Sequence, residues 1–302
     1  MTLKYDVVIL TEDTYTQSPE INWYNLQVLL EDHLVLDAIN SCGLKGVIKS
    51  WSDPDFDWSS TKSILFRTTW DYFDRFPEFS TWLEQLPKDL MSFNSLETIK
   101  WNMDKHYLLD LQSKGVNIVP THIINKNSSN SLVELIDLLG WEEAILKPTV
   151  SGAARHTYRL HSNDLTSFED NFSELIKHED FMLQPFQSAI VNEGELSLIV
   201  IDGKVTHSVK KVAKQGDFRV QDDHGGQVYH YQPSKEEVAF AEATIAACDP
   251  KPIYARVDII HDNQGSLAIM ELELIEPELF FRFHRQATFQ LADAIKRKLK
   301  SL

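Results

Sequence analysis

Three carboxylates near the C-terminus have the spacing of a metal site. Two apolar runs there are separated by Asp262–Gly265, a composition typical of a hairpin turn. Because side chains alternate along a strand, Glu271 and Glu273 share one face, and Asp258 of the neighbouring strand can join them. Carboxylates held together repel unless a cation lies between them. Their oxygens suit Mg²⁺, or Mn²⁺ as an alternative, beside phosphates; a solvated acidic sheet edge is the competing interpretation.

A lysine followed by small residues forms a second candidate site. The run 144–148 is predicted as a strand that ends near Lys147, and Ser151, Gly152 and Ala153 follow in a small, flexible loop. Gly152 permits close backbone approach, and successive amides can form an anion-binding nest. The segment matches neither the Gly-Lys-Ser/Thr phosphate loop nor the dinucleotide fingerprint. A phosphate-chain site and an ordinary surface turn therefore both stay open.

Two further segments carry groups that a nucleotide could use. Gln184, Pro185 and Phe186 close a predicted strand, and Glu193 and Glu195 follow. An extended segment can offer backbone groups to the edge of a base, and a carboxylate close behind it can bind ribose hydroxyls. The alternative is an interdomain linker with exposed acids.

Positive charge is concentrated in the predicted loop around Lys211 and Arg219. Gly216, Gly225 and Gly226 make this segment mobile. A basic, flexible loop opposite a carboxylate cluster is what a phosphate-transfer lid needs. A solvated surface loop explains the same residues equally well.

The elements that position these groups follow an α/β order. Strands are predicted at 7–10, 46–48 and 64–66, with a helix over 26–39 between the first two. Ligands gather at the carboxyl ends of strands in open α/β sheets, which places Arg67–Tyr72 beside one. Further along, a helix is expected over 100–114, a strand over 116–119, a helix over 131–139, strands at 158–160 and 181–184, a helix near 165–177, a hairpin of strands 196–201 and 204–212, a polar loop over 213–226, and helices over 236–248 and 289–299.

Composition narrows the functional classes. The 302 residues suffice for two or three compact domains, and the formal net charge is −16. That charge argues against a nucleic-acid partner and against docking on an anionic membrane. There is no signal-peptide pattern and no apolar run long enough to span a bilayer. The two cysteines lie far apart without metal-ligand spacing, so we expect a cytoplasmic protein without disulfides.

The order of these segments resembles that of the ATP-grasp superfamily. From about residue 96 onward the chain is similar to the ATP-binding domain of bacterial glutathione synthetase and its relatives. Four strings look like those of the cyclo-ligase of D-cycloserine biosynthesis and its relatives: RTTWDY at 67–72, WNMDK at 101–105, GDFRVQ at 216–221 and MELELIEP at 270–277. The resemblance implies an α/β (α+β) class, with an ATP-grasp fold behind an N-terminal α/β domain. We expect that domain at 1–95, a central ATP-grasp subdomain at 96–182 and a C-terminal one with lid and metal site at 183–302.

The resemblance also implies roles for particular residues. By this resemblance, Lys105 and Lys147 would contact the ATP phosphates, and Ser151, Gly152, Ala153 and Ala154 would form the loop that closes over them. Gln184, Pro185 and Phe186 would contact the adenine, and Glu193 or Glu195 would bind the ribose. The resemblance matches Lys211 and Arg219 to lid cations, and Asp258, Glu271 and Glu273 to magnesium ligands. Glu273 stands where the family often has asparagine, which alters the charge of the implied site.

Members of this superfamily phosphorylate a carboxylate with ATP, and an amine then attacks the acyl phosphate. The implied activity is an ADP-forming ligase for small carboxylate and amine substrates, as a monomer or a homodimer. Intramolecular closure of an amino-acid derivative and a nucleotide-binding protein without turnover are the alternatives. Arg256, Arg219 and Arg67 are candidates to hold the acceptor carboxylate, since arginine suits bidentate recognition. No nucleophilic residue is expected, and neither cysteine is expected to be catalytic.

Overall fold

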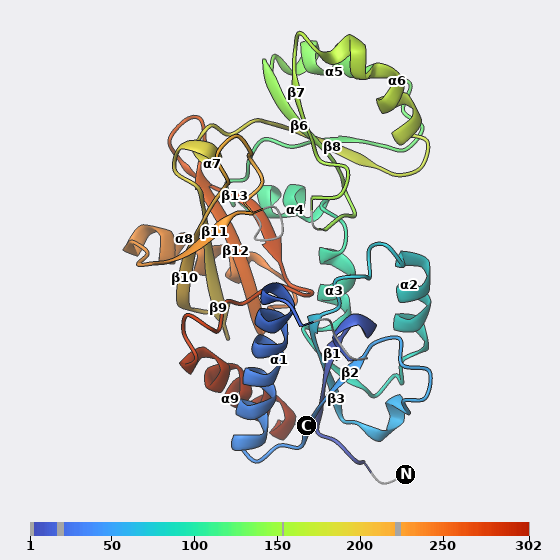
Figure 1. Cartoon of the computed structure of the whole chain (residues 1–302), viewed down its shortest axis with the longest axis vertical. Coiled ribbons are helices and arrows are strands. Elements are labelled where there is room, and N and C mark those ends of the chain that lie inside the picture. Colours follow the sequence, from blue (N-terminus) through green and yellow to red (C-terminus); the bar gives the residue numbers. More distant parts are fainter. Residues whose placement is uncertain (1–2, 17–20, 153, 221–224, 302) are drawn as a thin grey trace.

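The computed structural model describes residues 3–16, 21–152, 154–220 and 225–301, and it contains three β-sheets (Figure 1). The first sheet lies at one end of the molecule and the second at the other, with the third beside and between them. The mixed α/β class expected from the sequence is confirmed. The candidate residues lie where the three sheets approach one another.

The N-terminal sheet is parallel and has the strand order β2-β1-β3-β4. Its strand β1 is buried along its whole length, as expected for a parallel sheet covered on both faces. Its elements are β1 (Val7–Thr11), α1 (Trp23–Ser41), β2 (Gly46–Ser50), β3 (Ser63–Thr68), α2 (Phe76–Gln85) and β4 (Met91–Phe93), with short 3₁₀ turns at Asp13–Tyr15 and Trp58–Ser60. The Asn22 side chain caps α1 by accepting the backbone N–H of Asn25 at 2.8 Å.

The second sheet, at the opposite end from the N-terminal one, is antiparallel with the order β5-β8-β6-β7. Helices α5 and α6 pack beside each other against it (Figure 1). A capping box between Ser131 and Glu134 starts α5, and Gly140 in a left-handed conformation ends it. The elements are β5 (His122–Ile124), α5 (Leu132–Leu139), β6 (Glu143–Pro148), β7 (Tyr158–His161), α6 (Leu165–Leu175) and β8 (Phe181–Pro185).

The third sheet is antiparallel and has the order β11-β10-β9-β12-β13. Its elements are α7 (Ala189–Asn192), β9 (Glu195–Ile201), β10 (Lys204–Val212), β11 (Gln227–Tyr231), α8 (Lys235–Ala247), β12 (Tyr254–His261) and β13 (Leu267–Glu273). The last helix, α9 (Gln286–Lys300), packs against α1 of the N-terminal domain (Figure 1). Val7 and Ile9 share one core cluster with Leu291 and Ile295, so the two ends of the chain stabilise each other.

Several predicted elements differ from the structure. The helix expected over 100–114 is broken into α3 (Leu96–Asn102) and α4 (Tyr107–Ser113). The backbone N–H of Lys105 donates to the Thr149 carbonyl at 2.9 Å, a tertiary hydrogen bond that replaces continuation of the helix. The strand expected over 116–119 is only an isolated bridge between Ile118 and Ile269. The sequence patterns predicted no helix or strand where the structure has α2, β4 and β11.

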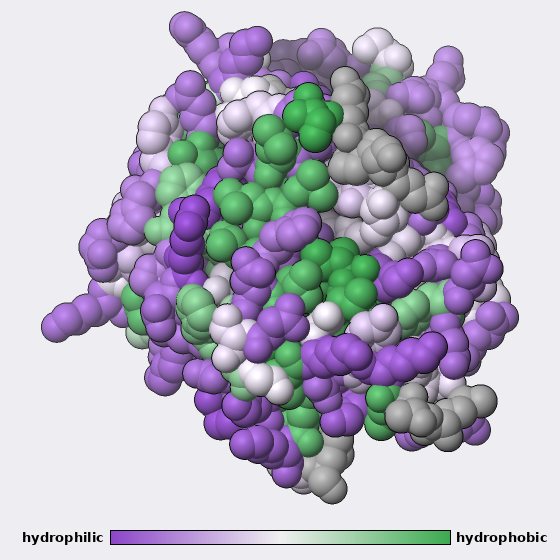
Figure 2. Space-filling view, turned by 60° about the horizontal axis from the view of Figure 1, so that its bottom comes forward, coloured by the Kyte–Doolittle hydropathy of each residue, from purple (hydrophilic) through white to green (hydrophobic). Residues whose placement is uncertain are grey.

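Figure 2 views the molecule from the end that holds the N-terminal sheet. Hydrophilic side chains cover most of this face, around a central area with apolar side chains. Among the described residues, no helix combines the length and the apolar character needed to cross a membrane.

Candidate active site

A cavity of about 280 Å³ lies among the three sheets and collects most of the predicted site residues. Asp258 lies behind its wall, buried in β12, and Glu193 is exposed and does not line the cavity. Ala153 lies outside the described residues. The predicted residues that do line the cavity are Lys105, Lys147, Ser151, Gly152, Gln184, Pro185, Phe186, Glu195, Lys211, Arg219, Arg256, Glu271 and Glu273; Ala154 also lines it.

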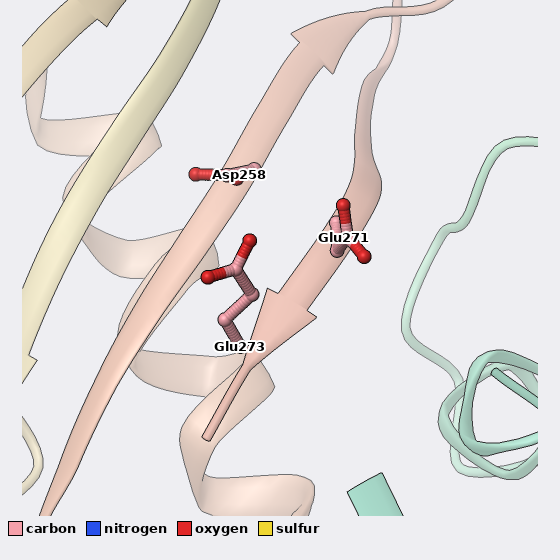
Figure 3. A group of neighbouring side chains, drawn as sticks. All are labelled: Asp258, Glu271 and Glu273. Atoms are coloured by element: carbon pink, nitrogen blue, oxygen red, sulfur yellow. The ribbon is translucent and has the colours of Figure 1, made fainter. Parts of the chain in front are cut away.

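The strand register brings the three carboxylates together. In the β12–β13 hairpin, Asp258 is directly opposite Glu271, and Arg256 is opposite Glu273. One carboxylate oxygen from each of the three acids lies within 4.8 Å of the others (Figure 3). The side chains of Glu271 and Glu273 are 29% and 27% exposed, so both reach the cavity. Three clustered oxygen ligands at a cavity wall fit a hard divalent cation.

The innermost acid, Asp258, is fully paired by the protein. Arg256 Nη2 lies 2.9 Å from Asp258 Oδ2 and also pairs with Glu273, while Lys211 Nζ lies 3.1 Å from Asp258 and also pairs with Glu195. Burial disfavours the Asp258 carboxylate, yet Arg256 and Lys211 outweigh it and lower its pKa. Lys211 is therefore a buried residue of β10, and the expectation that it belongs to a mobile loop is wrong.

The two outer acids differ in how far the protein balances their charge. Burial disfavours the Glu271 carboxylate, yet Lys105 and Lys147 outweigh it and lower the pKa of Glu271. Burial raises the pKa of Glu273 to about 7, and Glu271 and Asp258 add to the effect despite Arg256. Burial also raises the pKa of Glu276, and Glu273 adds to it. A divalent cation among these groups would supply the missing positive charge and lower such pKa values.

The two lysines differ in how they are held. Lys105 Nζ donates to the Ser151 carbonyl at 2.6 Å and lies 3.3 Å from Glu271. Lys147 lines the cavity, and no described carboxylate lies within 4.0 Å of its ammonium group. Burial lowers the pKa of Lys147, while Glu271 opposes this shift. Lys147 is thus a cation that a polyphosphate can pair with directly.

The small loop after β6 packs against the N-terminal domain. A Cβ atom on Gly152 would lie 2.5 Å from the Phe73 ring, so the loop needs glycine there to make this contact. The sequence suggested that Gly152 makes room for phosphate; in the structure, the Phe73 ring occupies the space beside it. Ser151 lines the cavity and accepts the Lys105 hydrogen bond, so the loop and the first lysine are fixed together.

Gln184–Phe186 form one edge of an apolar slot. Gln184 Nε2 donates to Thr121 Oγ1 at 3.0 Å, and the Arg159 guanidinium stacks 3.7 Å from the centre of the Phe186 ring. Facing side chains give the slot a flat apolar surface that suits a purine ring. Sequence reasoning missed these residues because single apolar side chains look like ordinary core; they are Val119, Ile145, Phe218, Val220 and Met270.

Backbone geometry separates the two ribose candidates. Gly194 has a φ of +89°, and a side chain there would clash with the Lys211 carbonyl. This close approach turns Glu195 inward, where it lines the cavity beside Lys211. Arg219, the second residue that the sequence predicted as a lid cation, also lines the cavity and pairs with Asp217 at 2.8 Å.

Family models match both parts of the chain. The model described as the RimK-like ATP-grasp domain matches residues 113–283, more than half of the 302 residues. The model described as the N-terminal domain of D-cycloserine synthetase DcsG matches residues 7–94.

Comparisons with individual proteins also find similarity to D-cycloserine synthetase DcsG and to a ligase. The chain is 26% identical over 287 residues to the cycloserine biosynthesis protein DcsG of Streptomyces lavendulae, covering 88% of this chain and 93% of that protein. It is 27% identical over 184 residues to a probable alpha-L-glutamate ligase of Shewanella halifaxensis (strain HAW-EB4), covering 60% of this chain but 38% of that protein. The crystal structure of D-cycloserine synthetase DcsG superposes with a TM-score of 0.84 at 23% identity, covering 97% of this chain and 99% of that one. The ATP-grasp fold expected from the sequence is confirmed.

Proposed function

The chain belongs to the RimK-like ATP-grasp family and is an ADP-forming carboxylate–amine ligase, and we propose that it uses ATP and Mg²⁺ to activate the carboxylate of a small amino-acid-like substrate for attack by an amine. One observation carries the proposal. One cavity is lined by an apolar slot, by Lys105 and Lys147, and by Glu271 and Glu273 of the three-carboxylate cluster. These three parts suit a base, a polyphosphate and a metal ion, respectively.

The proposed reaction has two steps. A carboxylate oxygen of the acceptor attacks the γ-phosphorus of ATP, and ADP leaves. The amine nitrogen then attacks the carbonyl carbon of the acyl phosphate and loses a proton, and phosphate leaves as the new amide bond forms. Neither step needs a nucleophilic side chain, in keeping with the burial of Cys248, which raises the pKa of its thiol.

The protein's own groups act by binding and orientation. Lys147 and Lys105 would hold the phosphates, and the slot along Gln184–Phe186 would hold adenine. Asp258, Glu271 and Glu273 would hold Mg²⁺, which supplies positive charge to the phosphate oxygens when bound. Arg256 and Lys211 are already engaged with these acids. We therefore assign them the role of positioning the ligands and setting their charge.

A second candidate function is intramolecular closure of an amino-acid derivative. It is favoured by the match of residues 7–94 to the N-terminal domain of a D-cycloserine synthetase, because this part of the chain contributes Tyr24, Trp70, Tyr72 and Phe73 to the cavity lining. The first step is the same in both functions, and only the origin of the attacking amine differs.

Three further expectations remain proposals. We retain the domain limits 1–95, 96–182 and 183–302, although β8 crosses the second limit and α9 packs on the first domain. We also retain a cytoplasmic location and a homodimer as the alternative to a monomer.

The test is release of ADP and phosphate by the purified protein with ATP and Mg²⁺, against a panel of amino acids and dipeptides. Release that requires one carboxylate and one amine supports ligation. Release with a single amino-acid derivative supports cyclisation. An intact fold that binds no ATP in Mg²⁺ contradicts the proposal.

A further inference from the structure

A small side pocket lies beside the cavity, between the N-terminal domain and the segment after β13. Tyr24, Trp70 and Glu278 line both spaces, so only these side chains separate the two. The side pocket offers about 10 Å³, roughly the space that one water molecule needs, so a larger group enters only if the lining side chains shift. Any ligand that enters it must have the rest of its structure in the main cavity.

Arg67, at the end of β3, lines this pocket but not the main cavity. It is 1% exposed, and its Nη1 donates to the Pro277 carbonyl at 2.9 Å. Its Nε has no hydrogen-bond partner, and within the described parts of the chain no carboxylate lies within 4.0 Å of its guanidinium. A buried guanidinium without an ion pair is costly and calls for an anion.

Neighbouring polar atoms share this lack of partners. Five buried side-chain atoms in the described residues have none, and three of them belong to the segment at the end of β3 and to the α1 residue that it contacts: Arg67 Nε, Thr69 Oγ1 and an oxygen of Asp32, whose other oxygen accepts from Thr68. Buried polar atoms normally find partners, so exceptions on neighbouring segments mark a place for a ligand or water. It lies at the carboxyl end of a central parallel strand, where ligands of open α/β sheets bind.

The nearby acids Glu31 and Glu278 do not form an ion pair with Arg67. Glu31 accepts the backbone N–H groups of Phe281 and Arg282, and Glu278 pairs with Arg282. Burial raises the pKa of Glu31 to about 7 and that of Asp32 to about 6, although Arg67 opposes both shifts. These acids therefore leave Arg67 with positive charge to offer.

We infer that Arg67 binds a substrate carboxylate other than the one that is phosphorylated, so that the substrate is an amino acid held by its own carboxylate. The inference rests on the proposed function. The reacting carboxylate must lie among Lys105, Lys147 and the acid cluster, and Arg67 is outside that part of the cavity. The bound carboxylate belongs either to the amino acid that supplies the amine or to an acceptor with a second carboxylate.

The experiment compares Arg67→Met with the wild-type protein. L- and D-amino acids are the probes, and the measured quantities are ADP release, KM for each substrate, KM for ATP, and kcat. Losing a charge-assisted hydrogen bond should raise KM for the amino acid about 10- to 100-fold, with kcat changed less than about threefold. The ATP KM should stay constant. Arg297→Met is the matched control, because Arg297 is exposed on α9 and, among the described residues, forms an ion pair with Asp202 alone.

The affected substrate identifies the source of the carboxylate. A raised KM for the amine substrate assigns it to the nucleophile, and a raised KM for the acceptor assigns it to a second acceptor carboxylate. If Arg67→Met does not fold, the wild-type protein still gives a test: the amine obtained by removing the carboxylate from the preferred amino acid should bind about 10- to 100-fold more weakly.

Three results overturn the inference. They are an unchanged amino-acid KM in Arg67→Met together with equal binding of the decarboxylated amine, a fall in kcat alone, and wild-type protein that binds ATP but is stimulated by no amino acid. Absence of ATP binding by the wild-type protein is a different result, since it overturns the proposed function itself.

Discussion

Two buried arginines show how differently the two ends of the cavity are built. Arg256, beside the acid cluster, donates to Asp258 and Glu273. Arg67, in the N-terminal domain at the end of β3, donates to one backbone carbonyl, and its Nε has no hydrogen-bond partner. At the first end the protein completes its own charge network, whereas at the second it leaves polar atoms for something else to complete.

The difference has a physical meaning. A site that stabilises developing charge works best when its groups are fixed before the substrate arrives. The network of Arg256, Lys211 and Asp258 fixes the acid cluster in this way. A recognition site gains specificity when a missing ligand group would leave a buried charge unpaired. The proposed function and the inferred role of Arg67 therefore agree with a prearranged acid cluster and with a recognition site that the ligand completes.

The largest expected effect is on the free energy of unfolding, which should fall much more when Arg256 is replaced than when Arg67 is. Arg256→Met leaves Glu273 without its cation and Asp258 with Lys211 alone, and breaking a buried ion pair costs about 3–5 kcal/mol. Arg67→Met removes no ion pair and one backbone hydrogen bond, so it should cost about 1 kcal/mol or less. Urea unfolding followed by tryptophan fluorescence measures both. Equal losses in the two variants would show that the two ends are built alike.

Turnover tests the acid cluster itself. Glu271→Gln keeps the shape of the side chain but removes a charge from the implied metal site and from Lys105, so kcat should fall about 10²- to 10³-fold. ADP release with saturating substrate is the measurement. Glu174→Gln, on the exposed face of α6, is the matched control. Turnover within tenfold of wild type would remove Glu271 from the metal site.

The pH dependence of stability tests the junction between α1 and the segment after β13. Burial raises the pKa of Glu31 from an ordinary value of 4.5 to about 7. Between these values the native protein keeps a proton that the unfolded chain loses, so the stability contribution of Glu31 falls as pH rises through this window and is constant above it. Wild type should lose about 2–3 kcal/mol more than Glu31→Gln between pH 4.5 and 8. Parallel pH profiles of the two proteins would contradict this assignment.

The smallest expected effect is on KM for ATP, and it distinguishes Glu195 from Glu193 as the ribose-binding residue. Glu195→Gln should raise KM for ATP about tenfold, because Glu195 lines the cavity. Glu193→Gln should stay within about twofold, because its side chain is exposed and outside the cavity. ATP titrations of initial rate give both values. A larger effect at Glu193 would assign the ribose to that residue.

Local patterns made much of this molecule predictable. Alternation in β12 and β13, and the turn between them, sufficed to place Asp258, Glu271 and Glu273 together. The break between α3 and α4 could not be predicted, because it depends on a hydrogen bond from Lys105 to Thr149, over forty positions away. The side pocket could not be predicted from the sequence either. Arg67 was a candidate from its motif, but only the packing of α1 and the segment after β13 shows that it lacks an ion pair.

The central claim is that this cavity activates a carboxylate with ATP. The most direct test is the exchange of ¹⁸O from a labelled carboxylate substrate into inorganic phosphate, measured with the wild-type protein, ATP, Mg²⁺ and an amino-acid panel. Acyl-phosphate formation transfers one carboxylate oxygen to phosphate, so we predict one labelled oxygen in each phosphate released. ADP and phosphate release without any label in the phosphate would show that water, not a carboxylate, attacks ATP, and would contradict the account.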